Sequence, residues 1–379
     1  MDLPIVLVRF NEIALKTRHT RSALRRLLRH NILTALTLNS APFEGIEDTW
    51  ERLIIQTSES GKVAEVSSKV FGVASTSPAV ECVSEVRSFC EIVSDMAKDS
   101  MKSGESFAIR VRRVGKHDFT SKEIAVKCGS SVIEALKGIG IEINVDLDSP
   151  NHELFVEVRG DRTFVYNAVT RGVGGLPLGS QGKVVSQLVG FDSILATWLM
   201  MKRGCRPILV LFDSGKTQEN LIGITRSSLL SYAGGNLPII ELPLTDIIGR
   251  IETTEPLETC LKYLSMMYIA DLQNAEGIVS SERFESPERT QLKTIEDCTK
   301  LDLPVFFPLV GLDDEYAKSL AQRIGGKTLA TKIRSKECPR KMLMEDTEST
   351  SAFDANSVIE KYRENIREAV TNALTKARI

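Results

Sequence analysis

Residues 186–205, SQLVGFDSILATWLMMKRGC, decide the fold of the C-terminal half of this chain. A strand-like approach leads into a tight Gly-Phe-Asp-Ser turn, and an apolar run with helical spacing follows. A turn that opens a helix presents successive backbone N–H groups, and glycine lets an anion approach the backbone, so the turn is a candidate phosphate site. The same residues also suit a plain helix start, in which Asp192 and Ser193 act as capping residues.

Outward from this turn, short apolar strands alternate with helices. Strands are expected at 184–189, 207–212, 237–241 and 276–280, and helices at 192–203, 217–232, 256–272 and 287–299. This alternation predicts a doubly wound parallel sheet, in which ligands bind at the carboxyl ends of the strands. A final amphipathic helix is expected from Phe353, Ile359, Tyr362, Ile366, Val370 and Leu374.

The chain before this sheet has a different pattern. The glycine-rich segment 170–183, TRGVGGLPLGSQGK, is expected to be a linker or a close-packed loop. An α+β unit precedes it, with strands at 4–10, 52–57 and 62–67 and a helix at 18–38. Next we expect helices at 81–101 and 120–137, the second with Ser121 as N-cap, and strands at 106–113, 141–145, 153–159 and 163–166, with a hairpin turn at 159–162.

Composition narrows the class of protein. A chain of 379 residues is longer than a domain with one hydrophobic core usually is, so two or three domains are expected. No apolar run approaches the ~20 residues of a membrane helix, and the N-terminus lacks a signal-peptide pattern, so we expect a cytoplasmic protein without a membrane partner. The seven cysteines include no C-x-x-C pair, which favours thiols over a disulfide framework.

Charge is unevenly distributed along the chain despite a net charge of −2. Residues 9–30 hold seven lysines and arginines against one acid, and residues 102–127 hold seven against three. A basic front half favours a polyanion partner such as a nucleic acid, although solvated arginine faces on helices are a common alternative.

Six stretches of the sequence match, in order, the motifs of one known family. They are NEIALK (11–16), KVFGVASTSPA (69–79), SFAIRVRRVGKHDFTSKEIA (106–125) with VDLDSP and LFVEVRGDRTFVY after it, RGVGGLPLGSQGKV (171–184), the LVGFDS turn (188–193) and FPLVGLDDEYAKSLAQRIG (307–325). On these stretches the chain resembles the tRNA 4-thiouridine synthetases, also called tRNA sulfurtransferases. The resemblance implies an N-terminal ferredoxin-like α+β domain at 1–75, a THUMP RNA-binding α/β domain at 76–168, and a PP-loop ATP pyrophosphatase domain with a doubly wound parallel sheet at 169–379.

The resemblance also implies partners and site residues. The basic N-terminal parts would bind tRNA, with candidates Lys16, Arg110, Arg112, Arg113, Lys116 and Lys122. Because strand residues alternate between faces, Arg110 and Arg112 are expected to share one face and Arg113 the other.

In the family's reaction ATP adenylates O4 of a uridine, and a persulfide sulfur then displaces AMP to give 4-thiouridine. ATP, with Mg²⁺ offsetting the phosphate charges, would lie against the turn and the strand ends. The implied nucleotide-binding residues are Leu188, Gly190, Phe191, Asp192, Ser193, Leu211, Phe212 and Ser281, with Asp192 also counted as catalytic. Cys338, set among lysines and arginines, corresponds to the family's catalytic cysteine.

The chain departs from the family pattern in four places. Leu188 and Val189 stand where the family's S-G-G-x-D-S loop has serine and glycine, and Ser281–Pro287 differ from its glycine-containing run. Only Cys260 stands near the position of a C-x-x-C pair, so no iron–sulfur cluster is expected. We expect no rhodanese domain after Cys338, so sulfur would come from a separate persulfide or sulfide donor.

Two alternatives stay open beside the sulfurtransferase hypothesis. One is a diverged paralogue that binds tRNA without adenylating it, and the other is a sulfur carrier for thiamine thiazole synthesis. The family often forms dimers, which makes a homodimer a further expectation.

Overall fold

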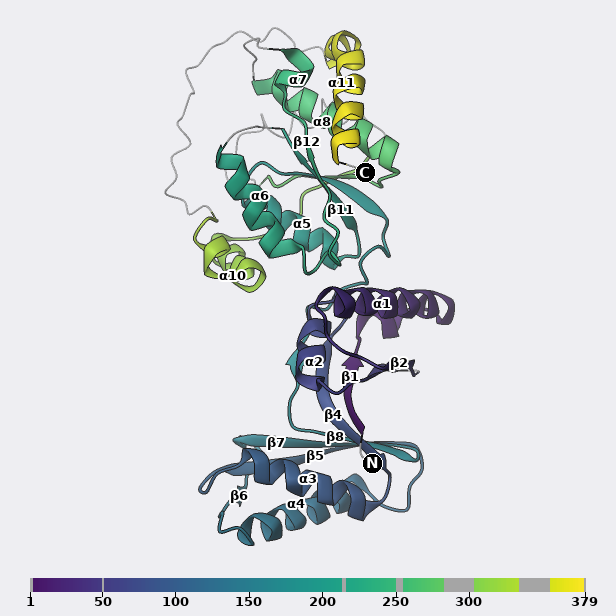
Figure 1. Ribbon diagram of the computed structural model, residues 1–379, viewed down its shortest axis with the longest axis vertical. Helices are drawn as coiled ribbons and strands as arrows, with labels where there is room; N and C mark the ends of the chain where they lie inside the picture. The colour runs from purple at the N-terminus through teal and green to yellow at the C-terminus, as the bar shows by residue number, and fades with distance from the viewer. Residues whose placement is uncertain are drawn as a thin grey trace. The chain divides into compact units, whose positions relative to one another are not determined.

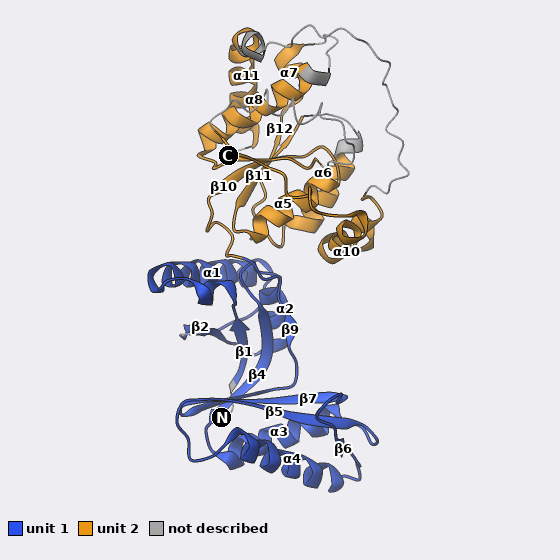
Figure 2. Ribbon diagram, turned by 180° about the vertical axis from the view of Figure 1, so that it is seen from behind, with its two compact units in different colours: residues 1–175 blue, residues 176–379 orange. Residues whose placement is uncertain are grey.

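The computed structural model describes residues 3–49, 51–212, 216–249, 255–282, 303–333 and 355–377. The chain divides into two compact units, Met1–Gly175 (unit 1) and Leu176–Ile379 (unit 2), which Figure 2 distinguishes by colour. None of the described helices has the length and apolarity that crossing a membrane requires. Each unit is built around its own sheet.

Unit 1 contains a mixed sheet in the order β2-β3-β1-β4-β8-β7-β5-β6, with β9 paired to β4. Its strands are β1 (Leu3–Arg9), β2 (Gly45–Asp48), β3 (Arg52–Gln56), β4 (Ser75–Val83), β5 (Ser106–Val114), β6 (Asn144–Val145), β7 (His152–Arg159), β8 (Arg162–Tyr166) and β9 (Thr170–Arg171). Its helices are η1 (Glu12–Leu15), α1 (Arg18–Leu38), α2 (Ser60–Ser68), α3 (Val86–Ser100) and α4 (Ser121–Lys137).

Strand β4 joins the two halves of this sheet. Its Ser75–Glu81 part pairs antiparallel with β1, and its last residues pair antiparallel with β8, with Val83 opposite Arg162. The helices α3 and α4 cover one face of β5 and β7 (Figure 1) and enclose an apolar core that includes Phe89 and Phe107. The two halves of unit 1 therefore share one continuous sheet.

Unit 2 contains a parallel sheet in the order β12-β11-β10-β13-β14. Its strands are β10 (Lys183–Gln187), β11 (Arg206–Leu211), β12 (Ile239–Glu241), β13 (Ile278–Val279) and β14 (Val305–Phe306). Its helices are α5 (Asp192–Lys202), α6 (Lys216–Leu229), α7 (Thr245–Ile248), α8 (Glu255–Gln273), α10 (Asp314–Ala330) and α11 (Ala355–Ala377).

Helices cover both faces of this sheet, as the doubly wound prediction requires (Figure 1). α8 and α11 pack together over one face, where Tyr263, Met266 and Val370 share a core with Val185 and Val210 of the strands. α5 and α6 lie on the other side of the sheet. The expected final amphipathic helix is confirmed as α11, with Tyr362, Ile366, Val370 and Leu374 buried.

Three local predictions are wrong. The segment 62–67, expected as a strand, lies within helix α2, because Val63, Ala64 and Ser67 are buried with helical rather than alternating spacing. Residues 81–83, expected to open a helix, belong to strand β4. The N-cap of α4 is Thr120 rather than Ser121: its hydroxyl accepts the Glu123 N–H, and the Glu123 carboxylate accepts the Thr120 N–H. The expected helix at 287–299 lies outside the described residues.

Candidate functional site

The sequence order of the strands reverses between β10 and β13 in the sheet of unit 2. From β10 the chain passes to β11 and β12 on one side, whereas β13 and β14 lie on the other. The segments that leave β10 and β13 therefore diverge at the carboxyl edge of the sheet, which is where open α/β sheets bind their ligands. The turn at 188–191 follows β10, and Ser280–Glu282 follow β13.

Ser193 connects these two segments. Its side chain is fully buried, and its Oγ accepts the backbone N–H groups of Val189 at 3.1 Å and Gly190 at 3.4 Å. The same hydroxyl donates to Ser281 Oγ at 3.2 Å, across 88 positions of sequence. Two residues predicted separately for the nucleotide site are thus in direct contact, and Ser193 fixes the shape of the turn.

The backbone of the turn leads directly into α5. The N–H of Ser193 bonds to the Gly190 carbonyl and that of Ile194 to the Phe191 carbonyl, each at 3.1 Å. Phe191 is the N-cap of α5 and makes no side-chain capping bond. Neither Asp192 nor Ser193 is therefore the N-cap. Asp192 instead lies in the first turn of α5.

Space lies open above Gly190. A Cβ atom built on this glycine would meet no heavy atom of the described residues within 4 Å, and the turn contains no residue with positive φ. Val189 therefore occupies its position without backbone strain, with its side chain 47% exposed. The turn leaves room for a phosphate group beside the first turn of the helix.

Besides Ser193, the three apolar side chains Leu188, Leu211 and Phe212 of the predicted nucleotide site are buried. Leu188 is 1% exposed, and its N–H bonds to the Val210 carbonyl at 2.8 Å, so it continues the pairing of β10 with β11. Leu211 and Phe212 are 2% and 3% exposed at the end of β11, and Phe212 packs in the core under α8 and α11. Near Leu188 a ligand would therefore contact backbone rather than side chain.

A cation from another element approaches the turn. The Lys332 Nζ lies 6.0 Å from the centroid of the Phe191 ring, just after the end of α10. In the sequence, Lys332 is one of the lysines and arginines around Cys338. Cys338 itself lies outside the described residues.

The predicted RNA-binding residues of unit 1 fall into two groups. Arg110 donates to Glu153 Oε1 at 2.7 Å and to the Leu147 carbonyl at 2.9 Å, and Arg113 donates to the His117 carbonyl at 3.3 Å. Arg112 is 63% exposed, with its Nη2 4.0 Å from Glu51 Oε2. The remaining candidates are exposed and form no ion pair with a described carboxylate: Lys16, Lys116 and Lys122. These lysines and Arg112 are more available to a polyanion than Arg110 or Arg113.

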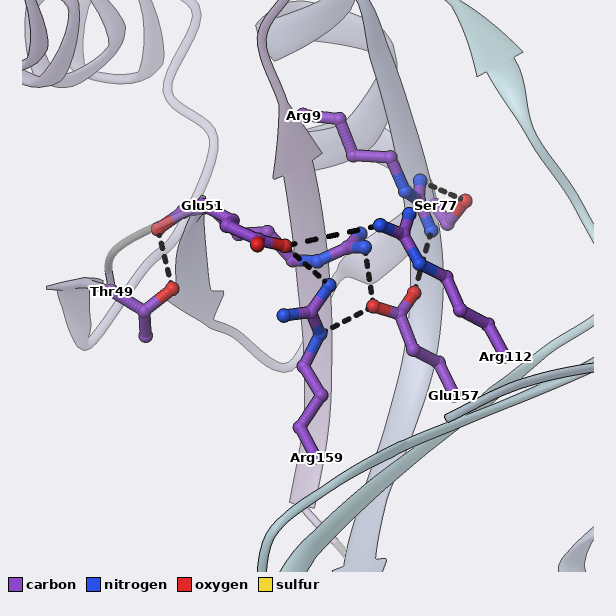
Figure 3. A network of polar contacts seen from close by, with 8 residues as sticks. Arg9, Thr49, Glu51, Ser77, Arg112, Glu157 and Arg159 are labelled. Atoms are coloured by element: carbon purple, nitrogen blue, oxygen red, sulfur yellow. Dashed lines mark hydrogen bonds and ion pairs between the residues drawn. The ribbon is translucent and has the colours of Figure 1, made fainter. Parts of the chain in front are cut away.

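A buried ion cluster, which sequence analysis missed, ties the two halves of unit 1 together (Figure 3). Glu157 of β7 is 1% exposed and forms an ion pair with Arg52 of β3, which is 3% exposed. It also accepts Arg159 Nε at 2.5 Å, and Arg9 of β1 approaches it at 4.0 Å. Burial lowers the pKa of Arg52 to about 10, against the opposing effect of the Glu157 charge. The only signal in the sequence was an acid between two valines of a strand.

Comparisons with known proteins agree with the order of these elements. Residues 5–77 match the ThiI ferredoxin-like domain, residues 84–167 the THUMP domain, and residues 179–367 the thiamine biosynthesis protein (ThiI). A protein named "Probable tRNA sulfurtransferase" from Methanosarcina mazei is 32% identical over 388 residues, covering 99% of this chain and 95% of the relative. One of the same name from Methanothermobacter thermautotrophicus is 33% identical over 347 residues, covering 86% and 85%.

Two solved structures are similar over most of their length. PH1313 from Pyrococcus horikoshii superposes with a TM-score of 0.70 at 27% identity, covering 86% of this chain and 100% of that one. A 4-thiouridine synthetase, crystallised with RNA and bound ATP, superposes with a TM-score of 0.77 at 21% identity over 98% of both chains, which supports the fold. By its sequence relatives and its matching domains, the chain belongs to the tRNA sulfurtransferase family.

Proposed function

We propose that this protein is an ATP-dependent tRNA sulfurtransferase that converts a uridine of tRNA to 4-thiouridine. The observation that carries the proposal is the contact of Ser193 with Ser281, which joins the turns after β10 and β13 beside the open space over Gly190. Family membership supports the reaction class, and this geometry supports a position for the triphosphate beside Gly190.

The turn suits a triphosphate in shape and in charge. Gly190 leaves the backbone uncovered, and the N-terminus of α5 favours negative charge beside it. The Lys332 ammonium is a further cation beside the same turn. Mg²⁺ would be held mainly by phosphate oxygens, with the Asp192 carboxylate as the acidic group of the turn, and it would offset the charge on the departing pyrophosphate.

The proposed reaction has two displacements. In the first, the uridine O4 attacks the α-phosphorus of ATP, and the bond to pyrophosphate breaks. In the second, a sulfur nucleophile attacks C4 of the base, and AMP leaves with the former O4. The chain's own contribution to the first step is to orient the phosphates and to stabilise the charge that develops on them.

Cys338 is the proposed carrier of sulfur. Ile333, the last described residue before it, follows Lys332, whose ammonium lies beside Phe191. Cys338 is the fifth residue after Ile333, and five residue steps span at most about 18 Å. This short separation along the chain supports a role for the Cys338 thiol in the reaction at the nucleotide site. A separate persulfide donor would transfer its outer sulfur to the Cys338 thiolate and leave as a thiolate, and an external thiol would later break the S–S bond between Cys338 and the base. Sulfide, if it is the donor, would attack C4 directly without loading Cys338.

Recognition of tRNA is assigned to unit 1. Exposed Arg112, Lys116 and Lys122 belong to β5, the following loop and the start of α4, and Lys16 follows η1. Such side chains bind phosphates and recognise the shape of folded RNA. The proposal includes a division of the chain into domains at 1–75, 76–168 and 169–379. It also includes a homodimer.

One observation favours the alternative of a tRNA-binding protein that no longer adenylates. The N–H groups of Val189 and Gly190, which a phosphate would use, already bond to Ser193 Oγ. A phosphate in the site would have to compete with that hydroxyl or use the remaining N–H groups of the turn.

Release of pyrophosphate in the presence of tRNA separates the two candidates. The sulfurtransferase proposal predicts that ATP is consumed only when tRNA is added, and that Arg112→Ala combined with Lys116→Ala weakens tRNA binding and lowers this turnover. Binding of tRNA without any turnover of ATP would instead establish the alternative. Arg87→Ala combined with Lys98→Ala, which removes two exposed cations from α3, is the matched control and should leave tRNA binding unchanged.

A further inference from the structure

Two cysteines from neighbouring helices are in contact in the core of unit 1. Cys90 lies on α3 and Cys128 on α4, and their Sγ atoms are 2.7 Å apart. An S–S bond measures about 2.05 Å, and carbon atoms in ordinary nonbonded contact lie roughly 3.5–4.0 Å apart. The two sulfur atoms are therefore nearer than a plain packing contact and within a small adjustment of a bond.

The surroundings favour reaction at one of the two thiols. Cys128 is fully buried, whereas Cys90 is 6% exposed. The contact with Cys128, the Ser131 hydroxyl and the Lys127 charge lower the pKa of Cys90, and the contact with Cys90 together with burial raises the pKa of Cys128. Since the thiolate is the nucleophile, Cys90 would react first and Cys128 second.

We propose that Cys90 and Cys128 are a redox site that closes to a disulfide when the protein meets a low-molecular-weight disulfide. The Cys90 thiolate attacks one sulfur of the external disulfide and releases one thiolate, which leaves a mixed disulfide on Cys90. Cys128 then loses its proton and attacks the Cys90 sulfur, which expels the second thiolate. Two protein thiols lose two electrons, and the external disulfide gains them as two thiols.

The cross-link would constrain the strand that carries the proposed RNA contacts. Cys90 and Cys128 are 38 positions apart, and the segment between them includes β5 and the start of α4. Five of the six RNA-binding candidates lie on that segment: Arg110, Arg112, Arg113, Lys116 and Lys122. The disulfide itself does not depend on the proposed function, because it requires only the packing of α3 against α4.

Peptide mapping of the full chain tests the proposal. The reduced protein is incubated with oxidised glutathione, its remaining thiols are alkylated, and it is digested with trypsin without reduction. The expected product links the peptides 88–98 and 128–137, each of which contains a single cysteine. Cys205→Ala, altered in unit 2, should give the same product, and Cys90→Ser should give none.

The proposal would be overturned if both peptides were recovered separately, alkylated or joined to glutathione. This result counts when another cysteine of the same wild-type sample has been oxidised. Thermal unfolding gives a second readout. Oxidation should raise the midpoint of the transition of unit 1 by roughly 5–15 °C. It should leave the Cys90→Ser/Cys128→Ser variant unchanged, and a linked wild-type protein without a rise would refute the constraint on unit 1.

Discussion

Replacing Glu157 by glutamine tests whether the buried ion cluster holds the two halves of unit 1 together. The Glu157 side chain is 2% exposed and faces the guanidinium groups of Arg52, Arg159 and Arg9. Glutamine keeps the shape but removes the negative charge, and its amide N–H₂ cannot accept from a guanidinium donor. The arginine charges then remain buried without their main counter-charge.

The expected loss follows from burial. Breaking a buried ion pair by removing one partner costs about 3–5 kcal/mol. For a unit of 175 residues that corresponds to a fall in the melting temperature of roughly 6–20 °C. The measurement is urea and thermal unfolding, with hydrogen exchange in peptides from β3 and β7 to localise the change.

A matched variant controls for the chemical change itself. Glu91→Gln removes the same charge from α3, where Arg87 and Glu91 form an exposed pair with side chains 89% and 62% exposed. No measurable change in stability is expected there, because exposed pairs contribute little. A Glu157→Gln variant whose unfolding free energy falls by less than about 1 kcal/mol would refute the argument from burial.

Three further predictions concern the turn in unit 2 and the acid stability of unit 1. Gly190→Ala should leave the melting temperature unchanged, because the new Cβ meets open space among the described residues, yet it should weaken ATP binding at least about tenfold in calorimetry. Gly172→Ala is the contrasting variant: its Cβ would overlap the Val73 carbonyl, so it should destabilise the fold. Ser193→Ala should lower the unfolding free energy measured in urea by about 1–3 kcal/mol, because two N–H groups lose their acceptor, and an unchanged value would contradict the role given to this hydroxyl. The hydrogen bond from Arg159 lowers the pKa of Glu51 below its ordinary 4.5, so the stabilisation that the Glu51 carboxylate contributes is complete above pH 4.5 and lost as the pH falls through the folded pKa. Glu51→Gln should therefore flatten the fall of stability at acid pH. An unaltered slope would count against this role of Glu51.

The sheet of unit 2 could be predicted because its strands centre on short apolar runs. A strand buried on both faces appears in the sequence as a continuous run of apolar residues, as in PILVLF at 207–212. Helices between such runs restrict the sheet to a small number of possible topologies. The prediction of a strand at 62–67 was wrong because a short run with scattered valines is compatible with both the helical and the strand period. Its packing in the fold as α2 shows that it is a helix.

Resemblance to the family identified residues of the site but not the contacts between them. Ser193 and Ser281 were each assigned from a motif, yet their hydrogen bond depends on how β13 pairs with β10. Glu157 was missed for the same reason, since its partners Arg52 and Arg9 come from strands more than a hundred residues earlier. Contacts across a sheet depend on which distant strands pair, and the motif on one strand does not specify its partner.

The central claim is that RNA held by unit 1 presents a uridine to an ATP site at the edge of the sheet of unit 2. Its most direct test is to incubate the purified full chain with tRNA, ATP, Mg²⁺ and sulfide, and to analyse the nucleosides of the recovered tRNA by mass spectrometry. The account predicts 4-thiouridine that depends on ATP, together with matching release of pyrophosphate. Bound tRNA that returns with every uridine unchanged, while ATP remains intact, would contradict it.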